Sequence, residues 1–138
     1  MMSGVASYSG TPLAKKLGIK ADATVCLSNP PANYAKLVAP LPDGVSLGDR
    51  VSGRTDLIHI FVTRRTDLER RLTSTLKSMR PDAAVWVSWP KKSSGVATDV
   101  TEDTIREVAL PMGLVDIKVC AVDNTWSGLK LVIRKELR

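Results

Sequence analysis

The 138-residue chain has 43% hydrophobic and 25% charged residues, the composition of an ordinary globular domain. This length predicts a single domain over residues 1–138 that buries roughly two thirds of its unfolded surface. No apolar run approaches the ~18 residues of a membrane span, and Met1 to Gly10 has neither an apolar core nor a cleavage-like site. We therefore expect a cytoplasmic, bacterial protein without a membrane partner.

The net charge of +6 and a pI near 9.6 favour anionic partners. The basic residues are scattered in doublets along the chain. On helix surfaces such doublets are more often solvated than part of a nucleic-acid track, so nucleic acid is the weaker alternative partner. The basic segments are Lys15-Lys16, Arg64-Arg65, Arg70-Arg71, Lys91-Lys92 and Lys130 to Arg138.

The two cysteines, Cys26 and Cys120, each lie within an apolar, strand-like run. Neither has a second ligand at metal spacing, so buried, reduced thiols are favoured over a disulfide or a metal site. We predict no metal site.

The N-terminal third predicts short elements. Thr11-Pro12 is typical of a helix start, with Thr11 as the N-cap, and Gly18 closes that helix. Ala23 to Leu27 predicts the first strand, which the prolines of Ser28-Asn29-Pro30-Pro31 end. Asn33 to Val38 predicts a short helix.

Residues 45–47 predict at most an edge strand, because the link that follows, from Gly48 to Asp56, is too short for a crossover helix.

The central stretch predicts a strand, a helix and a parallel strand. Asp56 to Thr63 is almost unbroken apolar sequence, which favours a strand covered on both faces. Thr66 and Glu69 predict a capping box at the start of the helix. Ala83 to Trp89 predicts the second strand, joined to the first by a crossover helix. The apolar stripe of that helix is Leu68, Leu72, Leu76 and Met79.

The C-terminal part predicts a loop, a helix and a hairpin. Lys91 to Thr98 is a basic loop, and Asp99 or Thr101 caps the next helix, with Glu102 completing a box with Asp99. Pro111 and Gly113 end this helix, whose buried stripe is Ile105, Val108 and Ala109. An antiparallel hairpin follows: Val115 to Val122, a turn from Asp123 to Gly128, and Leu129 to Arg134.

This element order resembles the class I S-adenosylmethionine methyltransferase fold. The resemblance implies a three-layer, Rossmann-like α/β fold, with a mostly parallel sheet, a C-terminal antiparallel hairpin and a truncated methyltransferase-like topology. The segments that carry it are Leu17 to Val25, Asp56 to Phe61, Leu76 to Ser88, Gly113 to Val119 and Trp126 to Glu136.

The whole chain also resembles a group of small bacterial proteins, a domain-of-unknown-function family, which implies no established activity. That resemblance rests on Ser9 to Gly18, Trp86 to Lys92 and Thr125 to Lys130.

The sequence departs from the methyltransferase pattern at the cofactor site. The resemblance implies a glycine-rich turn after the first strand and an acidic residue after the second. Here the turn from Ser28 to Tyr34 has no glycine, Asp49 is the only acidic candidate, and the family's third strand is missing. We therefore expect no S-adenosylmethionine binding and name no cofactor.

Because loops after parallel strands meet at the carboxyl edge of the sheet, we predict a crevice there for a small anionic ligand. Its lysines, arginines and hydroxyls would bind the anion, and its aromatic rings would offer flat surfaces. The alternative is that Trp89 packs under the loop and the lysines are solvated. The candidates are Asn29, Tyr34, Thr63, Arg64, Arg65, Trp89, Lys91, Lys92, Ser93, Ser94 and Trp126.

We identify no catalytic residue. His59, the sole histidine, lies in mid-strand and is expected to be a hydrogen-bonded core residue. Asn29-Pro30-Pro31 invites comparison with the Asn-Pro-Pro-aromatic motif of amino-methyltransferases, but no aromatic residue follows directly, so a rigid turn is favoured. The leading hypothesis is a non-methylating binding or regulatory module; the alternatives are a divergent transferase and a weak nucleic-acid binder.

Overall fold

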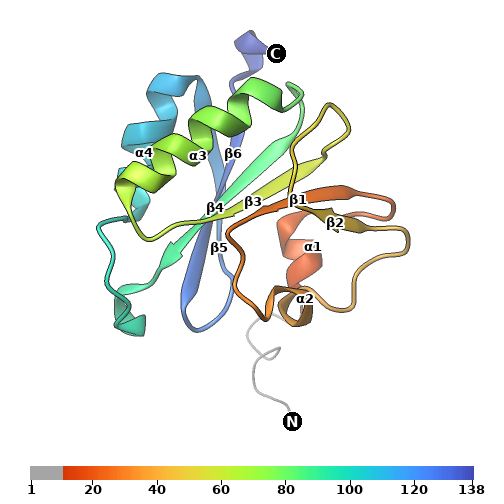
Figure 1. Cartoon of the computed structure of the whole chain (residues 1–138), viewed down its shortest axis with the longest axis horizontal. Helices are drawn as coiled ribbons and strands as arrows, with labels where there is room; N and C mark the ends of the chain where they lie inside the picture. The colour runs from red at the N-terminus through yellow and green to blue at the C-terminus, as the bar shows by residue number, and fades with distance from the viewer. Residues whose placement is uncertain (1–10) are drawn as a thin grey trace.

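A six-stranded sheet in the order β2-β1-β3-β4-β6-β5 organises the computed structural model, which describes residues 11–138 (Figure 1). β1 to β4 are parallel to one another, and β6 is antiparallel to both β4 and β5. This confirms the predicted α/β fold with its mostly parallel sheet and C-terminal hairpin. The strands are β1 Thr24–Ser28, β2 Ser46–Gly48, β3 Leu57–Phe61, β4 Ala84–Pro90, β5 Leu114–Ala121 and β6 Trp126–Ile133.

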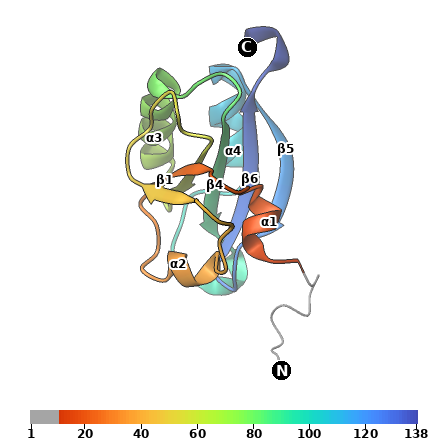
Figure 2. The ribbon, with the colours of Figure 1, turned by 90° about the vertical axis from the view of Figure 1, so that its right-hand side faces the viewer.

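Helices cover both faces of the sheet, which gives the three predicted layers (Figure 2). α1 (Leu13–Leu17) and α2 (Tyr34–Leu37) pack on one face. α3 (Arg65–Ser78) and α4 (Glu102–Ala109) pack on the other. Met1 to Gly10, where we expected neither an apolar core nor a cleavage-like site, lies outside the described residues. Short 3₁₀ segments are Lys92–Ser94, Leu110–Met112 and Lys135–Leu137.

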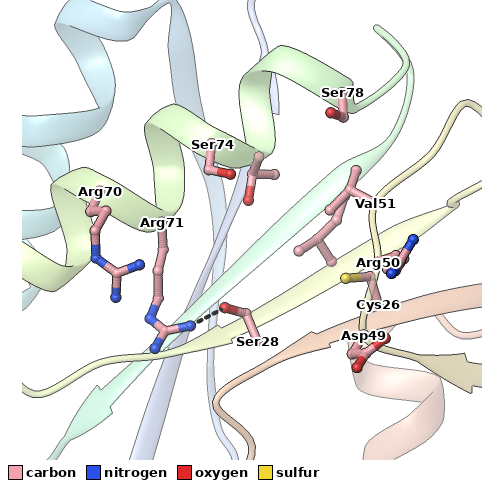
Figure 3. Close-up of a pocket in the computed structure, with 11 residues that line it drawn as sticks. Cys26, Ser28, Asp49, Arg50, Val51, Arg70, Arg71, Ser74 and Ser78 are labelled. Atoms are coloured by element: carbon pink, nitrogen blue, oxygen red, sulfur yellow. Dashed lines mark hydrogen bonds between the residues drawn. The ribbon is translucent and has the colours of Figure 1, made fainter.

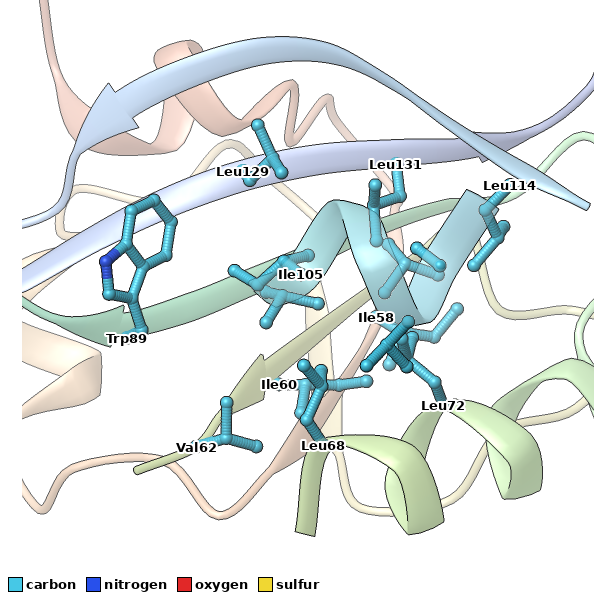
Figure 4. Packing of buried hydrophobic residues seen from close by; sticks show 14 of the residues in the cluster. Ile58, Ile60, Val62, Leu68, Leu72, Trp89, Ile105, Leu114, Leu129 and Leu131 are labelled. Carbon is cyan, nitrogen blue, oxygen red and sulfur yellow. The ribbon is translucent and has the colours of Figure 1, made fainter. Parts of the chain in front are cut away.

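β3 is buried along its whole length, as its continuous apolar sequence predicts. Ile58 and Ile60 point into the core beneath α3 and α4, whereas Leu57 and Phe61 point into the core beneath α1 and α2. The helical stripe of α3 meets the first of these cores (Figure 4). β3 is thus the central strand that both layers share.

The edge strand predicted at residues 45–47 is present as β2, one residue further along the chain. Its three residues pair in parallel with β1 at the sheet edge, in the register Thr24 with Ser46. No helix lies between β2 and β3, in agreement with the shortness of that link.

The predicted cap of α3 is wrong. α3 begins at Arg65, so Thr66 lies within the helix and does not cap it. The Arg65 N–H instead donates to Asp99 Oδ1 at 2.7 Å. Glu69 pairs with the Arg65 side chain. The cap comes from a distant loop, so no local motif could reveal it.

Two other helix starts also differ from prediction. Pro12, not Thr11, occupies the N-cap position of α1, with an extended ψ of 146°. In α4 the cap is Thr101, one of the two predicted candidates, and Thr104 completes the box in place of Glu102. A threonine hydroxyl at this position can accept from the cap N–H as a carboxylate does.

The final turn is shorter than predicted, because β6 already begins at Trp126. Asp123 Oδ1 accepts from the N–H groups of Thr125 and Trp126 at 2.8 and 2.7 Å, which tightens the turn. Trp126 therefore lies in the sheet and not in a loop.

Both cysteines are free; Cys26 is buried in β1 as predicted, whereas Cys120 is only half-buried in β5. No helix within residues 11–138 has the length and hydropathy to cross a bilayer.

Candidate functional site

The predicted crevice begins at the turn after β1, where the side chain of Asn29 bonds across to the next strand. Asn29 has a left-handed backbone, with φ of 58°. Its Nδ2 donates to the Phe61 carbonyl at 3.2 Å, so it spans the carboxyl ends of β1 and β3. A ligand in an open α/β sheet normally lies between two such strand ends.

Tyr34 is buried and forms part of a chain of polar side chains on the α1 side of the sheet. Its hydroxyl lies 2.9 Å from His59 Nδ1, and His59 Nε2 lies 2.7 Å from Ser88 Oγ. All three side chains are buried, and the His59 ring stacks on Phe61 at 4.4 Å between centroids. The prediction of a hydrogen-bonded core histidine agrees with this geometry, and Tyr34 is not accessible to a ligand in this conformation.

Burial lowers the pKa of His59 to about 3 and raises the pKa of Tyr34. The ring is therefore neutral at physiological pH, with one nitrogen donating and the other accepting.

The loop after β4 is held by bonds within itself and to the turn between β5 and β6. Trp89 is 8% exposed and packs in the core beneath α4. Lys91 Nζ donates to the Asp123 carbonyl at 2.6 Å, and Ser94 Oγ donates to the Lys91 carbonyl at 2.6 Å. Lys92 and Ser93 are exposed. Trp89 therefore lies in the core and offers no open flat surface to a ligand.

The other candidates are dispersed. The Thr63 carbonyl accepts from Thr98 Oγ1 at 2.7 Å, Arg65 pairs with Glu107 at 2.7 Å, and Arg64 is exposed. Trp126 packs edge-to-face on Phe61, on the α1 side of the sheet, whereas Trp89 lies on the α4 side. The two tryptophans therefore share no surface.

A different hollow of about 310 Å³ lies between β1, the segment after β2, and α3 (Figure 3). It opens where the chain runs from β2 to β3 without a helix, so that α3 alone shields this side of β1. We call it the arginine pocket. It is lined by Cys26, Ser28, Asp49, Arg50, Val51, Ile58, Arg70, Arg71, Ser74, Thr75 and Ser78.

Arg71 is the best-oriented cation of the arginine pocket. Its Nε donates to Asp67 Oδ2 at 2.8 Å, and its Nη1 donates to Ser28 Oγ at 2.7 Å, at the carboxyl end of β1 (Figure 3). Arg70 pairs with the other oxygen of Asp67. Burial alone would raise the pKa of Asp67, but the bonds from Arg71 and Arg70 outweigh it and lower that pKa.

The opposite wall carries Asp49, Arg50 and Cys26. Burial, and secondarily the charge of Asp49, raise the pKa of the Cys26 thiol. The thiol is therefore protonated and is not an activated nucleophile.

Sequence reasoning missed the arginine pocket because Arg70-Arg71 was interpreted as a solvated doublet. The available signal was the spacing of Arg70, Arg71, Ser74 and Ser78, which places four polar side chains along one side of α3. Within residues 11–138, no group of three or more metal-ligating residues occurs.

The residues present do not fit S-adenosylmethionine. The turn after β1 contains Pro30 and Pro31, which have no N–H to offer, and the Asn29 side chain is bonded to the Phe61 carbonyl at the carboxyl end of β3. Asp49 follows β2, as the acidic partner of the ribose would, but it lines the arginine pocket.

Solved structures nevertheless share the fold. The chain is similar to a provisionally assigned type 11 methyltransferase from Sulfolobus solfataricus, with a TM-score of 0.62 at 12% identity, over 89% of this chain and 90% of that one. It is also similar to LepI in complex with SAM, with a TM-score of 0.55 at 12% identity. That match covers 96% of this chain but only 42% of LepI. At such identities the likeness shows the fold alone.

No curated protein matches the chain. The family model described as a protein of unknown function, DUF3052, matches residues 50–135, which is more than half of the chain. Both resemblances expected from the sequence are therefore confirmed, and the chain belongs to the DUF3052 family.

Proposed function

We propose that this protein is a non-methylating, Rossmann-like binding module that holds a small anionic ligand in the arginine pocket. The observation that carries the proposal is Arg71, fixed between Asp67 and Ser28 so that its remaining N–H groups are pre-oriented. A guanidinium has donors in a planar fork that matches a carboxylate or a phosphate.

The charge of the pocket supports an anion. Arg70 and Arg71 lie on the α3 wall, where both pair with Asp67, and Arg50 and Asp49 lie on the opposite wall. Three guanidinium groups thus oppose two carboxylates. Among the described residues, Arg50 makes no ion pair, so its charge is available to a ligand.

The size of the pocket supports a small metabolite. A volume of about 310 Å³ lies at the lower end of the usual range for ligand sites, roughly 300–1,000 Å³. The hydroxyls of Ser74 and Ser78 can donate to further oxygens of the ligand. We therefore favour a phosphorylated or carboxylated compound of a few carbons. The two free thiols favour a reducing compartment, and we place the protein in the cytoplasm.

The test is a thermal-shift screen of small phosphates and carboxylates, followed by calorimetry on the ligand found. Arg71→Gln should weaken binding by about tenfold or more, because a charge-assisted bond to an anion is lost. Arg64→Gln is the matched control: it removes an exposed arginine at the start of the same helix. If no anion shifts the melting temperature, or if both variants bind as wild type does, the proposal is wrong.

A divergent transferase is the second candidate, supported by the likeness to a methyltransferase over 89% of the chain. Calorimetry with S-adenosylmethionine distinguishes the two. Submicromolar binding that Asn29→Ala or Asp49→Asn weakens would replace the binding-module proposal with the transferase.

A further inference from the structure

A second basic hollow lies on the other side of the sheet, between α1 and the edge strand β5. It has a volume of about 530 Å³ and is lined by Thr11, Lys15, Lys16 and Lys118 to Ala121. Lys118 Nζ donates to the Lys16 carbonyl at 3.1 Å, which ties β5 to α1. We call this hollow the lysine groove.

Two further lysines extend the positive charge of the lysine groove. Lys130 on β6 is paired with Lys118 on β5. Its Nζ reaches the end of α1, where it lies 3.4 Å from the point that a Cβ on Gly18 would occupy. Its pKa is lowered by burial and then by the charges of Lys118 and Lys20. Lys15, Lys16 and Lys118 line the groove, and Lys20 and Lys130 add positive charge beside it.

None of these five lysines forms an ion pair with a carboxylate in residues 11–138. Every ion pair among the described residues uses an arginine, and none includes a lysine. Like charges held close together repel one another and destabilise the fold. A bound multivalent anion would relieve this repulsion, because no side chain of the cluster does so.

The shape and chemistry of the groove indicate which anion. Its volume is that of a small-molecule site, and its lining has no aromatic ring on which a nucleobase could stack. Lysine ammonium groups are compact point charges that suit phosphate oxygens and do not read a base edge. A chain of phosphates would place several charges among the lysines at once.

We propose that the lysine groove binds an oligophosphate, either the phosphate chain of a nucleotide or an inorganic polyphosphate. The groove is lined by residues of α1 and β5, and the arginine pocket by residues of α3. α1 and α3 lie on opposite faces of the sheet (Figures 1 and 2). The two sites are therefore separate, and this proposal stands independently of the proposed function.

The probe is tripolyphosphate, measured by calorimetry on the full chain at physiological ionic strength. The double variant Lys16→Gln/Lys118→Gln should bind about tenfold more weakly, equivalent to about 1.4 kcal/mol. The control Lys36→Gln/Lys77→Gln removes the same charge from exposed lysines of α2 and α3 and should bind as wild type does. Arg71→Gln should also bind as wild type does, which keeps this test apart from that of the arginine pocket.

ATP, measured beside tripolyphosphate, separates the two sources of the phosphate chain. ATP binding no tighter than tripolyphosphate indicates an inorganic chain, and tighter ATP binding indicates a nucleotide; both support the groove as an oligophosphate site. Three results would overturn the proposal. They are no tripolyphosphate binding, equal binding by the groove variant and the control, and single-stranded RNA binding that is tighter than tripolyphosphate binding and persists at physiological salt.

Discussion

The buried His59 makes the stability of this protein depend on pH between about 5 and 7, a range in which no other side chain of the sequence normally titrates. His59 is fully buried between Tyr34 and Ser88, and burial lowers its pKa to about 3 from an ordinary 6.5. In the unfolded chain the imidazole takes up a proton as pH falls through 6.5, but in the folded protein it does not. The unfolded state thus binds more protons between these two values, and stability falls as pH falls.

The magnitude follows from the two pKa values. Between pH 7 and pH 5, protonation of the unfolded chain lowers the free energy of unfolding by about 2 kcal/mol. The carboxylates Asp56 and Asp67, whose pKa values are lowered from 3.8, add acid sensitivity only below that range. Because the sequence has a single histidine, the loss in this window belongs to His59.

Urea denaturation at pH 7, 6 and 5 measures this loss, and His59→Gln is the control, since glutamine keeps a polar side chain but does not titrate. The variant should be less stable at pH 7 and nearly independent of pH down to pH 5. An NMR titration of the His59 ring in the folded wild type gives a second measurement. A ring that titrates near pH 6.5, or an equal loss of stability in His59→Gln, would refute the reasoning.

Three further predictions concern packing and capping. Gly128→Ala places a Cβ 3.1 Å from the fully buried Trp86 ring, so urea denaturation should show a loss of about 1–3 kcal/mol, and an unchanged midpoint would contradict it. Asp99→Ala removes the cap on Arg65, which should cost about 0.5–2 kcal/mol and speed amide exchange in the first turn of α3; unchanged exchange would show that the cap is not used. Leu72→Ala in the same helix should cost about 2–5 kcal/mol in thermal unfolding, and a loss below 1 kcal/mol would mean that the core collapses around the cavity.

The central strands and helices were predictable because their signals are local. The apolar run of β3, the Leu68 and Leu72 stripe of α3, and the left-handed Gly18 each depend on residues that are neighbours in sequence. The same local logic failed at the start of α3, where Asp99 caps the helix across a separation of 34 residues.

The predicted site residues show the same limit. Placing loops at one edge of the sheet was a statement about topology, and the strand order agrees with it. Whether a side chain enters a crevice or the core depends on packing. Trp89 and Trp126 lie on opposite faces of the sheet, and the Tyr34 hydroxyl is bonded to the buried His59 ring.

By itself, the sequence determined which segments are buried, because hydrophobic periodicity is set by the geometry of a helix or strand. It also determined that the turn at Pro30 and Pro31 cannot serve as a glycine-rich cofactor loop. Only the tertiary structure decided which charged side chains meet: Arg71 with Ser28 across 43 residues, and Lys118 with the Lys16 carbonyl across 102. Surface charges follow no periodicity that encodes their partners, so both basic hollows arise from the way distant segments pack.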